Sequence, residues 1–241
     1  MATVAIIQAR MGSTRLPGKV LREILGRPMV DYVVDRARQM SETQKTVVAT
    51  STLDQEEPLV EHLRERNIPV VRGPEEDVLA RYVQAAEARD AEAVVRITAD
   101  CPLLMPAVSD RVVRAFRESD CDYASNTLER MYPLGLDTEV LSIETLHRAD
   151  REASDPADRE HVTRYVQRHP SNFELRSVTD DTDWSDLRWT VDEAPDLQFV
   201  RRVYGALGDE AIEATYDDVL EILEAHPEWT DINRKVEQKT C

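Results

Sequence analysis

Short apolar runs alternate with amphipathic segments through the first half of the chain. The runs VAII, TVVATS, IPVVRG and AVVRITAD are apolar or β-branched along much of their length, which is typical of strands buried on both faces. Between them the apolar residues recur with helical spacing, and helices are expected over residues 28–40, 56–66, 76–89 and 106–118, approximately. This alternation predicts an α/β fold with an open, mostly parallel sheet and helices on both faces.

The pattern loosens after Asp120. CDYASN, LGLDTEVLS and FELRSVT have the composition of strands, and charged helices are expected over about 143–152 and 158–169. We therefore predict that residues 128–183, approximately, form a small inserted α+β arm within a single domain spanning 1–241. LRWTVD resumes the core pattern as a further strand, and closing helices are expected over about 195–204 and 216–225.

The composition narrows the range of partners. The chain has 47 acidic and 30 basic residues and a formal net charge of −17, so nucleic acid and anionic membranes, which require a cationic surface, are not expected. No apolar run approaches the ~20 residues of a membrane span, and the N-terminus does not resemble a signal peptide. Cys101, Cys121 and Cys241 are scattered, which predicts a cytoplasmic protein without a disulfide framework or zinc site.

The stretch IIQARMGSTRLPGKVL follows the first predicted strand and places Arg10, Arg15 and Lys19 around Gly12 and Gly18. In open α/β sheets ligands bind at the carboxyl ends of the strands. Glycines allow backbone N–H groups to approach an anion, and the cations neutralise it, so the loop is predicted to hold phosphates. The alternative is a solvated loop whose cations pair with nearby carboxylates.

Two common phosphate-binding motifs do not fit this loop. A Walker A loop has four residues between its glycines and Ser or Thr after the lysine, whereas here five residues separate the glycines and a valine follows Lys19. The dinucleotide fingerprint G-x-G-x-x-G is also absent from the sequence.

The same loop, read as ARMGSTRLPGK, resembles the signature of cytidylyltransferases that make CMP-activated acidic sugars, and most closely their spore coat polysaccharide biosynthesis SpsF branch. RGPEEDVLARY, ITADCPLL, YPLGLDTEVLS, REHVTRY and LRWTVDEAPDL resemble that branch in the same order, so the resemblance extends from residue 4 to about residue 200. It implies a Rossmann-like fold of the nucleotide-diphospho-sugar transferase type. It also implies a CTP:sugar cytidylyltransferase for surface polysaccharide biosynthesis, with Mg²⁺ as cofactor, CTP and a small acidic or related sugar as substrates, and a homodimer formed through the arm.

Roles for the residues of the loop follow from this resemblance. It implies that the first part of the loop holds the nucleotide, and that Arg15 and Lys19 bind its β- and γ-phosphates and stabilise the leaving pyrophosphate. The nucleotide-binding candidates in the loop are Ala9, Arg10, Gly12, Ser13, Arg15 and Lys19.

Two aspartates are candidate metal ligands. Asp100 ends the run AVVRITAD, at the carboxyl edge of the predicted sheet, where carboxylate oxygens suit Mg²⁺. The alternative is a turn or helix-cap aspartate before Pro102. Asp192 ends the predicted strand LRWTV in the same way, and the resemblance implies that the two aspartates share the metal, which would remove their mutual repulsion.

The remaining candidates also rest on the resemblance. In RGPEEDVLARY it implies nucleotide contacts for Arg72 and Asp77 and a sugar contact for Arg81, with a capped helix carrying an Asp77–Arg81 ion pair as the alternative. In the arm it implies that several polar residues close over the acceptor sugar, although most such residues on charged helices are simply solvated. These arm candidates are Asp137, Glu139, Glu160 and His161.

Two other functions remain open at this point. A glycosyltransferase of the A type would share the fold and the metal, but it typically carries a D-x-D motif, whereas TADCPLL contains one aspartate. A non-catalytic nucleotide-binding protein is also possible on such a scaffold. It would have no need for a clamp on a leaving group. The residues do not identify the acceptor sugar or the base.

Overall fold

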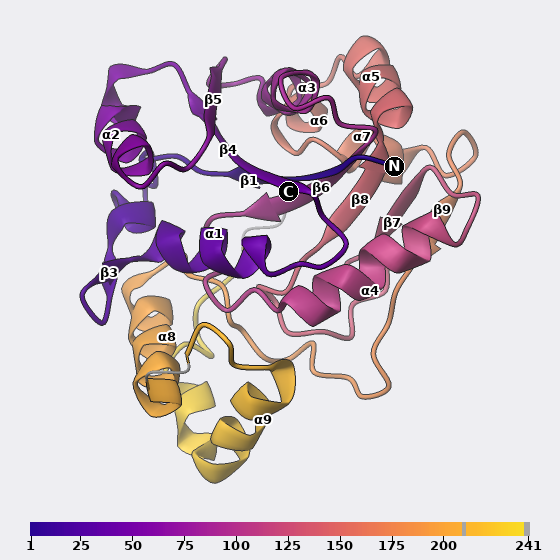
Figure 1. The fold of residues 1–241 in the computed structure, drawn as a ribbon. Helices are drawn as coiled ribbons and strands as arrows, with labels where there is room; N and C mark the ends of the chain where they lie inside the picture. Colours follow the sequence, from indigo (N-terminus) through magenta and orange to yellow (C-terminus); the bar gives the residue numbers. More distant parts are fainter. Residues whose placement is uncertain (209–210, 239–241) are drawn as a thin grey trace.

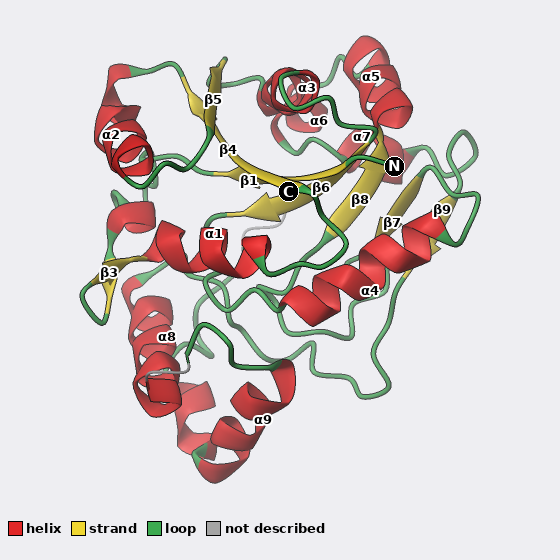
Figure 2. Ribbon diagram, in the orientation of Figure 1, coloured by secondary structure: helices red, strands yellow, loops and turns green. Residues whose placement is uncertain are grey.

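The computed structural model describes residues 1–208 and 211–238. Within them, a seven-stranded sheet has the order β5-β4-β1-β6-β8-β7-β9 (Figures 1 and 2). Its strands are β1 (Thr3–Gln8), β4 (Lys45–Ser51), β5 (Val70–Gly73), β6 (Ala93–Thr98), β7 (Tyr123–Ser125), β8 (Glu139–Ser142) and β9 (Leu175–Ser177). Only β8 is antiparallel to its neighbours, β6 and β7, so the sheet is open and mostly parallel, as predicted.

Helices cover both faces of this sheet (Figure 2). Ala5 and Ile7 of β1 face α1, α2 and α4, while Val4 and Ile6 face α3, α5 and α7, as the two-residue period of a strand requires. These helices are α1 (Met29–Arg38), α2 (Glu57–Glu65), α3 (Val78–Glu87), α4 (Pro106–Arg117), α5 (Ile143–Glu152) and α7 (Arg164–Arg168).

A third apolar cluster joins the C-terminal helices to the sheet domain. It packs α8 (Ala194–Leu207) and α9 (Tyr216–Ala225) against the start of α1 and the fully buried Trp189. Its smaller elements are the hairpin of β2 (Glu23–Ile24) and β3 (Arg27–Pro28) and the 3₁₀ helix η4 (Pro227–Asp231). In Figure 1 this layer lies below α1, on the side away from α3 and α5.

The predicted helices are found near their expected bounds, with one exception. The helix expected over 158–169 is two short helices, α6 (Pro156–Glu160) and α7, separated by a turn at residues 161–163. Val162 in that turn has φ 53°, a left-handed conformation that β-branched residues rarely adopt, and its side chain is fully buried in the cluster around α3 and α5. Tertiary packing of Val162 therefore overrides the helical pattern of the sequence.

The predicted strand in LRWTVD is wrong. Residues 187–191 are extended but form only a single bridge, between Arg188 and Leu134. The backbone N–H groups of Trp189 and Thr190 instead donate to the carbonyl of Leu134, and that of Val191 donates to the carbonyl of Asp100. The segment is thus held by loops at the edge of the sheet rather than by a neighbouring strand.

Residues 128–183, the predicted arm, share the seven-stranded sheet with the rest of the chain. They contain β8 and β9, which belong to the same sheet as β1, and the helices α5, α6 and α7. Cys101 and Cys121 are free thiols, and Cys241 lies outside the described residues. Among the helices of the described chain, none combines the length and the apolar character needed to cross a bilayer.

Gly135 gives a test of the loop that faces the extended segment. It has φ +116°, and a Cβ there would lie 2.6 Å from the backbone nitrogen of Thr190. We expect Gly135→Ala to lower the free energy of unfolding by about 2–4 kcal/mol, because both the backbone strain and the clash must be relieved. Urea unfolding followed by circular dichroism measures this loss.

Gly205 in α8 provides the matched control, because a Cβ there meets nothing within 4 Å. Gly205→Ala is expected to leave stability unchanged or to raise it by up to about 1 kcal/mol, the helix propensity difference. Equal stabilities for Gly135→Ala and wild type would show that the loop adapts freely.

Candidate active site

The loop after β1 is shaped by a few backbone and carboxylate contacts. The N–H of Ala9 donates to the carbonyl of Ala49, and the N–H of Met11 donates to a carboxylate oxygen of the buried Glu56. Gly18, with φ 65°, precedes the 3₁₀ helix η1 (Lys19–Leu21) in a left-handed conformation that glycine adopts without strain. This turn brings the loop back so that Lys19 reaches the carboxyl ends of the strands.

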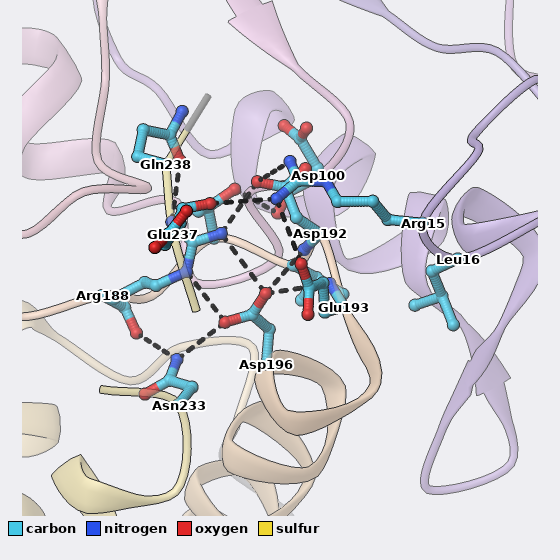
Figure 3. A network of polar contacts seen from close by, with 12 residues as sticks. Arg15, Leu16, Asp100, Arg188, Asp192, Glu193, Asp196, Asn233, Glu237 and Gln238 are labelled. Carbon is cyan, nitrogen blue, oxygen red and sulfur yellow. Dashed lines mark hydrogen bonds and ion pairs between the residues drawn. The ribbon is translucent and has the colours of Figure 1, made fainter. Parts of the chain in front are cut away.

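Lys19 lies between two carboxylates. Its Nζ is 2.8 Å from Oδ2 of Asp100 and 2.9 Å from Oδ1 of Asp192, and it also donates to the carbonyl of Val191. Nη2 of Arg15 is 2.9 Å from the other oxygen of Asp192. The structure therefore brings together the four residues that the sequence analysis placed in catalysis and metal binding (Figure 3 labels Arg15, Asp100 and Asp192).

This pairing holds all three groups in their charged forms. Burial alone would raise the pKa of Asp100, but the charge and hydrogen bond of Lys19 lower it to about 2. Burial likewise opposes ionisation of Asp192, whose pKa is nevertheless lowered by Lys19 and by a hydrogen bond from Arg188. The pKa of Lys19 is raised, because the two carboxylates outweigh its burial.

Asp192 is positioned by a second ion pair that the sequence analysis did not predict. Nε of Arg188 is 2.9 Å from Oδ1 of Asp196, and its Nη2 is 2.8 Å from Oδ2 of Asp192 (Figure 3). Oδ2 of Asp196 accepts the N–H groups of Asp192 and Glu193 and closes a capping box at the start of α8. The sequence pattern E-A-P-D at residues 193–196 is the feature from which this helix start could have been predicted.

Two adjoining cavities open around these charges. The first, of about 360 Å³, is lined by residues of the loop and the strand ends. The second, of about 780 Å³, shares part of that lining and extends beneath α6 and α7. The predicted residues that line the first are Ala9, Arg10, Gly12, Ser13, Arg15, Lys19, Asp100 and Asp192, and those that the second adds are Asp137, Glu139, Glu160 and His161.

Arg72, Asp77 and Arg81 line neither of these two cavities, and their predicted contacts with the nucleotide and the sugar stay predictions. Arg72 pairs with Glu57. Asp77 caps α3 by accepting the N–H of Ala80, and it pairs with Arg159 of α6. The alternative ion pair between Asp77 and Arg81 does not form between these described residues. Arg81 is only 1% exposed, so its guanidinium is enclosed by the protein.

Two of the arm candidates, Asp137 and Glu139, line the second cavity, but their carboxylates already bind arginines of the protein. Asp137 forms a bidentate pair with Arg130, at 2.6 and 2.8 Å. Glu139 is only 4% exposed and is surrounded by donors, including Arg96 of β6. Glu139 lines the larger cavity and is paired with Arg96, a cavity residue that was not predicted from the sequence, so its direct contact with a sugar stays a prediction.

The carboxylates at the junction of the cavities form a two-oxygen donor set. Among the described residues, no group of three or more His, Cys, Asp or Glu side chains is arranged to hold a metal ion. Asp100 and Asp192 are nevertheless close enough to contact one cation, since Nζ of Lys19 lies within 2.9 Å of both. Such a pair fits Mg²⁺, which is bound by one or two carboxylates together with phosphate oxygens.

The open sheet, the cationic loop and the two carboxylates at its edge define a fold of the nucleotide-diphospho-sugar transferase type. Residues 4–218 match the model of the cytidylyltransferase family. The chain belongs to this family, whose members are nucleotidyltransferases that use CTP and act on a sugar.

Individual relatives agree with this assignment. The chain is 32% identical over 230 residues to the spore coat polysaccharide biosynthesis protein SpsF of Bacillus subtilis (strain 168), covering 92% of this chain and 94% of that protein. It is 37% identical over 117 residues to a 3-deoxy-manno-octulosonate cytidylyltransferase of Acidobacterium capsulatum, covering 48% and 46% of the two chains. A cytidylyltransferase structure from Leptospira borgpetersenii superposes with a TM-score of 0.91 at 26% identity, covering all of both chains.

The Lys19 contacts predict a pH-dependent effect on stability. In the wild type the pKa of Asp100 is lowered from its ordinary value of 3.8 to about 2. The contribution of Asp100 to the stability of the fold is therefore fully present above pH 3.8 and is lost as the pH falls toward 2. In Lys19→Met the effect of burial on this pKa is no longer offset by Lys19, so we expect the variant to take up the proton at a higher pH than the wild type does. We expect a deficit of about 1–3 kcal/mol near neutral pH that shrinks on acidification, because protonation relieves the unpaired carboxylate.

Urea unfolding of wild type and Lys19→Met at about pH 7 and about pH 4.5 measures the two deficits. A deficit that is equal or larger at the lower pH would contradict the assignment of Lys19 as the partner of Asp100.

Proposed function

We propose that this cytidylyltransferase couples CTP to an acidic sugar, with Mg²⁺ and release of pyrophosphate, for the synthesis of a surface polysaccharide. The observation that carries the proposal is the meeting of Arg15, Lys19, Asp100 and Asp192 where the two cavities join. One cavity would then hold the nucleotide and the other the sugar, with the reacting groups at the junction.

The proposed reaction is an in-line displacement at the α-phosphate of CTP. A hydroxyl oxygen of the sugar loses its proton to solvent and forms a bond to the α-phosphorus. The bond from that phosphorus to the oxygen that bridges to the β-phosphate breaks, and pyrophosphate leaves with the electron pair of that bond. Catalysis of this kind depends on positioning and on charge neutralisation. Arg15 and Lys19 supply cations that exchange their carboxylate partners for the β- and γ-phosphates, and thereby stabilise the leaving group.

Asp100 and Asp192 would hold the magnesium ion. When bound, the ion supplies a divalent charge for the phosphate oxygens. Arg188 and Asp196 keep Asp192 oriented whether or not Lys19 is engaged, because their contacts reach the other carboxylate oxygen and the backbone. This division of roles leaves Lys19 free to move to the phosphates.

Cationic groups in the larger cavity support an acidic acceptor. Its lining includes the carboxylates of Asp100, Asp137, Glu139, Glu160 and Asp192, and an equal number of arginines together with one histidine. These basic residues are Arg10, Arg15, Arg96, His161, Arg164 and Arg168. An anionic sugar would be attracted to such a surface and oriented by it. The relative named as a 3-deoxy-manno-octulosonate cytidylyltransferase suggests one such sugar.

A substrate screen tests the proposed function. The four nucleoside triphosphates are incubated with Mg²⁺ and a panel of acidic and neutral sugars, and pyrophosphate is measured. We expect release only with CTP and an acidic sugar, because the phosphate loop and the basic wall must both be occupied. Release with neutral sugars alone would overturn the acidic acceptor, and formation of free CDP from an activated sugar would indicate a glycosyltransferase.

Variants in the same assay test the roles of the residues. Lys19→Met and Asp100→Asn are expected to lower kcat by about 10²–10³-fold, the usual effect of removing a charge-stabilising group. Lys45→Met and Asp90→Asn serve as matched controls, since these two residues pair with each other on the surface and line neither cavity. Near-wild-type turnover by the Lys19 or Asp100 variant would refute its role.

We further propose a homodimer formed through residues 128–183. This segment carries the only antiparallel strand of the sheet in the described chain and ends at the sheet edge with β9, an edge strand that a second copy can cover. Multi-angle light scattering at micromolar concentration is expected to give twice the chain mass of 27.5 kDa. A mass of one chain would rule out a stable dimer.

A further inference from the structure

Arg96 lies on the wall shared by the two cavities. It belongs to β6, where Arg96 and Thr98 point to the same face because side chains alternate along a strand. Asp100 continues this row just beyond the end of β6, and all three residues line both cavities. A ligand in the larger cavity that reaches Asp100 with its reacting oxygen therefore passes along Arg96.

The guanidinium of Arg96 is only partly used by the protein. Among the described residues its one hydrogen-bond partner is the carboxylate of Glu139, which contacts Nη1. Its Nε is buried and makes no hydrogen bond there, and 17% of the side chain is exposed. A buried donor without a partner costs free energy. The exposed part of the guanidinium can donate to an acceptor atom that a ligand supplies in the cavity, whereas the enclosed Nε cannot.

Glu139 holds this guanidinium in one orientation. Its Oε1 accepts hydrogen bonds from the hydroxyl of Tyr123 at 2.6 Å, from the hydroxyl of Thr163 and from the amide of Gln167 at 3.0 Å. Burial would raise the pKa of Glu139, but Arg96 and these donors lower it, so the carboxylate stays ionised. The broken helix between α6 and α7 contributes here, because it places Thr163 against Glu139.

The surroundings of Arg96 favour an anion. Arg10 lines both cavities and forms no ion pair with the described residues, and His161 and Arg164 line the larger cavity. Burial, followed by the positive charges of Arg96, Arg164 and Arg10, lowers the pKa of His161, whereas Glu160 opposes the shift. Arg10, Arg96, His161 and Arg164 line the same cavity, although Arg164 is also paired with Asp158.

We propose that Arg96 binds the carboxylate of the acceptor sugar through the edge of its guanidinium that Glu139 leaves free, and that Glu139 is the positioning residue for this contact. The inference rests on the proposed acidic acceptor and assigns its recognition to a particular side chain. Arg15 and Lys19 serve the triphosphate at the other end of the row, which leaves Arg96 for the sugar. Because Glu139 holds Nη1 and the protein encloses Nε, Nη2 is left to donate a charge-assisted hydrogen bond to a carboxylate oxygen.

The test compares an acidic sugar with its neutral ester. N-acetylneuraminate and 3-deoxy-manno-octulosonate are each assayed beside their methyl esters, with saturating CTP and Mg²⁺, for wild type and Arg96→Gln. For whichever acid is used, we expect the wild type to prefer acid over ester. Arg96→Gln should raise the KM for the acid about tenfold or more, leave the KM for CTP within about twofold, and abolish the preference.

Further variants separate recognition from folding. Glu139→Gln should weaken the acid preference less than Arg96→Gln does, because the guanidinium remains but loses its orientation. Arg96→Lys keeps the charge without the fork and should retain part of the preference, so it carries the same comparison if Arg96→Gln does not fold. Arg64→Gln, at an exposed position of α2 that lines neither cavity, is the matched control and should match wild type.

The outcomes distinguish this inference from the proposed function. An acid preference that is unchanged in Arg96→Gln or Arg96→Lys, together with an unchanged KM, overturns the role of Arg96 while leaving the acidic acceptor intact. A wild-type enzyme that turns over only neutral sugars overturns both.

Discussion

The site depends on one interaction, the bridge that Lys19 makes between Asp100 and Asp192. Two partly buried carboxylates at one sheet edge repel each other unless a cation lies between them. The ammonium group supplies that cation within 2.9 Å of both carboxylates. The fold can therefore keep a pair of acidic ligands assembled, and the same lysine lies beside the place where a triphosphate would bind.

Around this bridge the structure separates groups that can change partners from groups that hold their neighbours in place. Lys19 and Arg15 contact carboxylates at the edge of a cavity and can exchange them for phosphates. Arg188 and Asp196 are more enclosed and hold the backbone and one oxygen of Asp192. At the other end of the row along β6, Glu139 orients Arg96 in the same way. Asp192 and Arg96, which both face a cavity, are thus each held by a partner of opposite charge.

The structure departs from the local pattern of the sequence where an interaction between distant segments competes with that pattern. The helix expected over 158–169 is interrupted because Val162 is buried and Thr163 is needed by Glu139, 24 residues earlier in the chain. Arg72, Asp77 and Arg81 look available in the sequence, but each is engaged or enclosed in the fold. Arg96 was overlooked because an arginine inside a strand has no local signature of binding.

The sequence by itself determined the alternation of strands and helices, the cationic glycine loop and the two aspartates, because periodicity, glycine and charge act over a few neighbouring residues. Tertiary structure alone decided that Lys19 bridges the aspartates, that Arg188 and Asp196 support one of them, and that Glu139 orients Arg96 rather than facing solvent. The Arg96–Glu139 and Lys19–Asp192 contacts join residues that are 43 and 173 positions apart in the sequence. The contacts of Arg188 are shorter in sequence, but they depend on a loop that such distant contacts hold in place. Only the folded sheet brings those segments to a common edge.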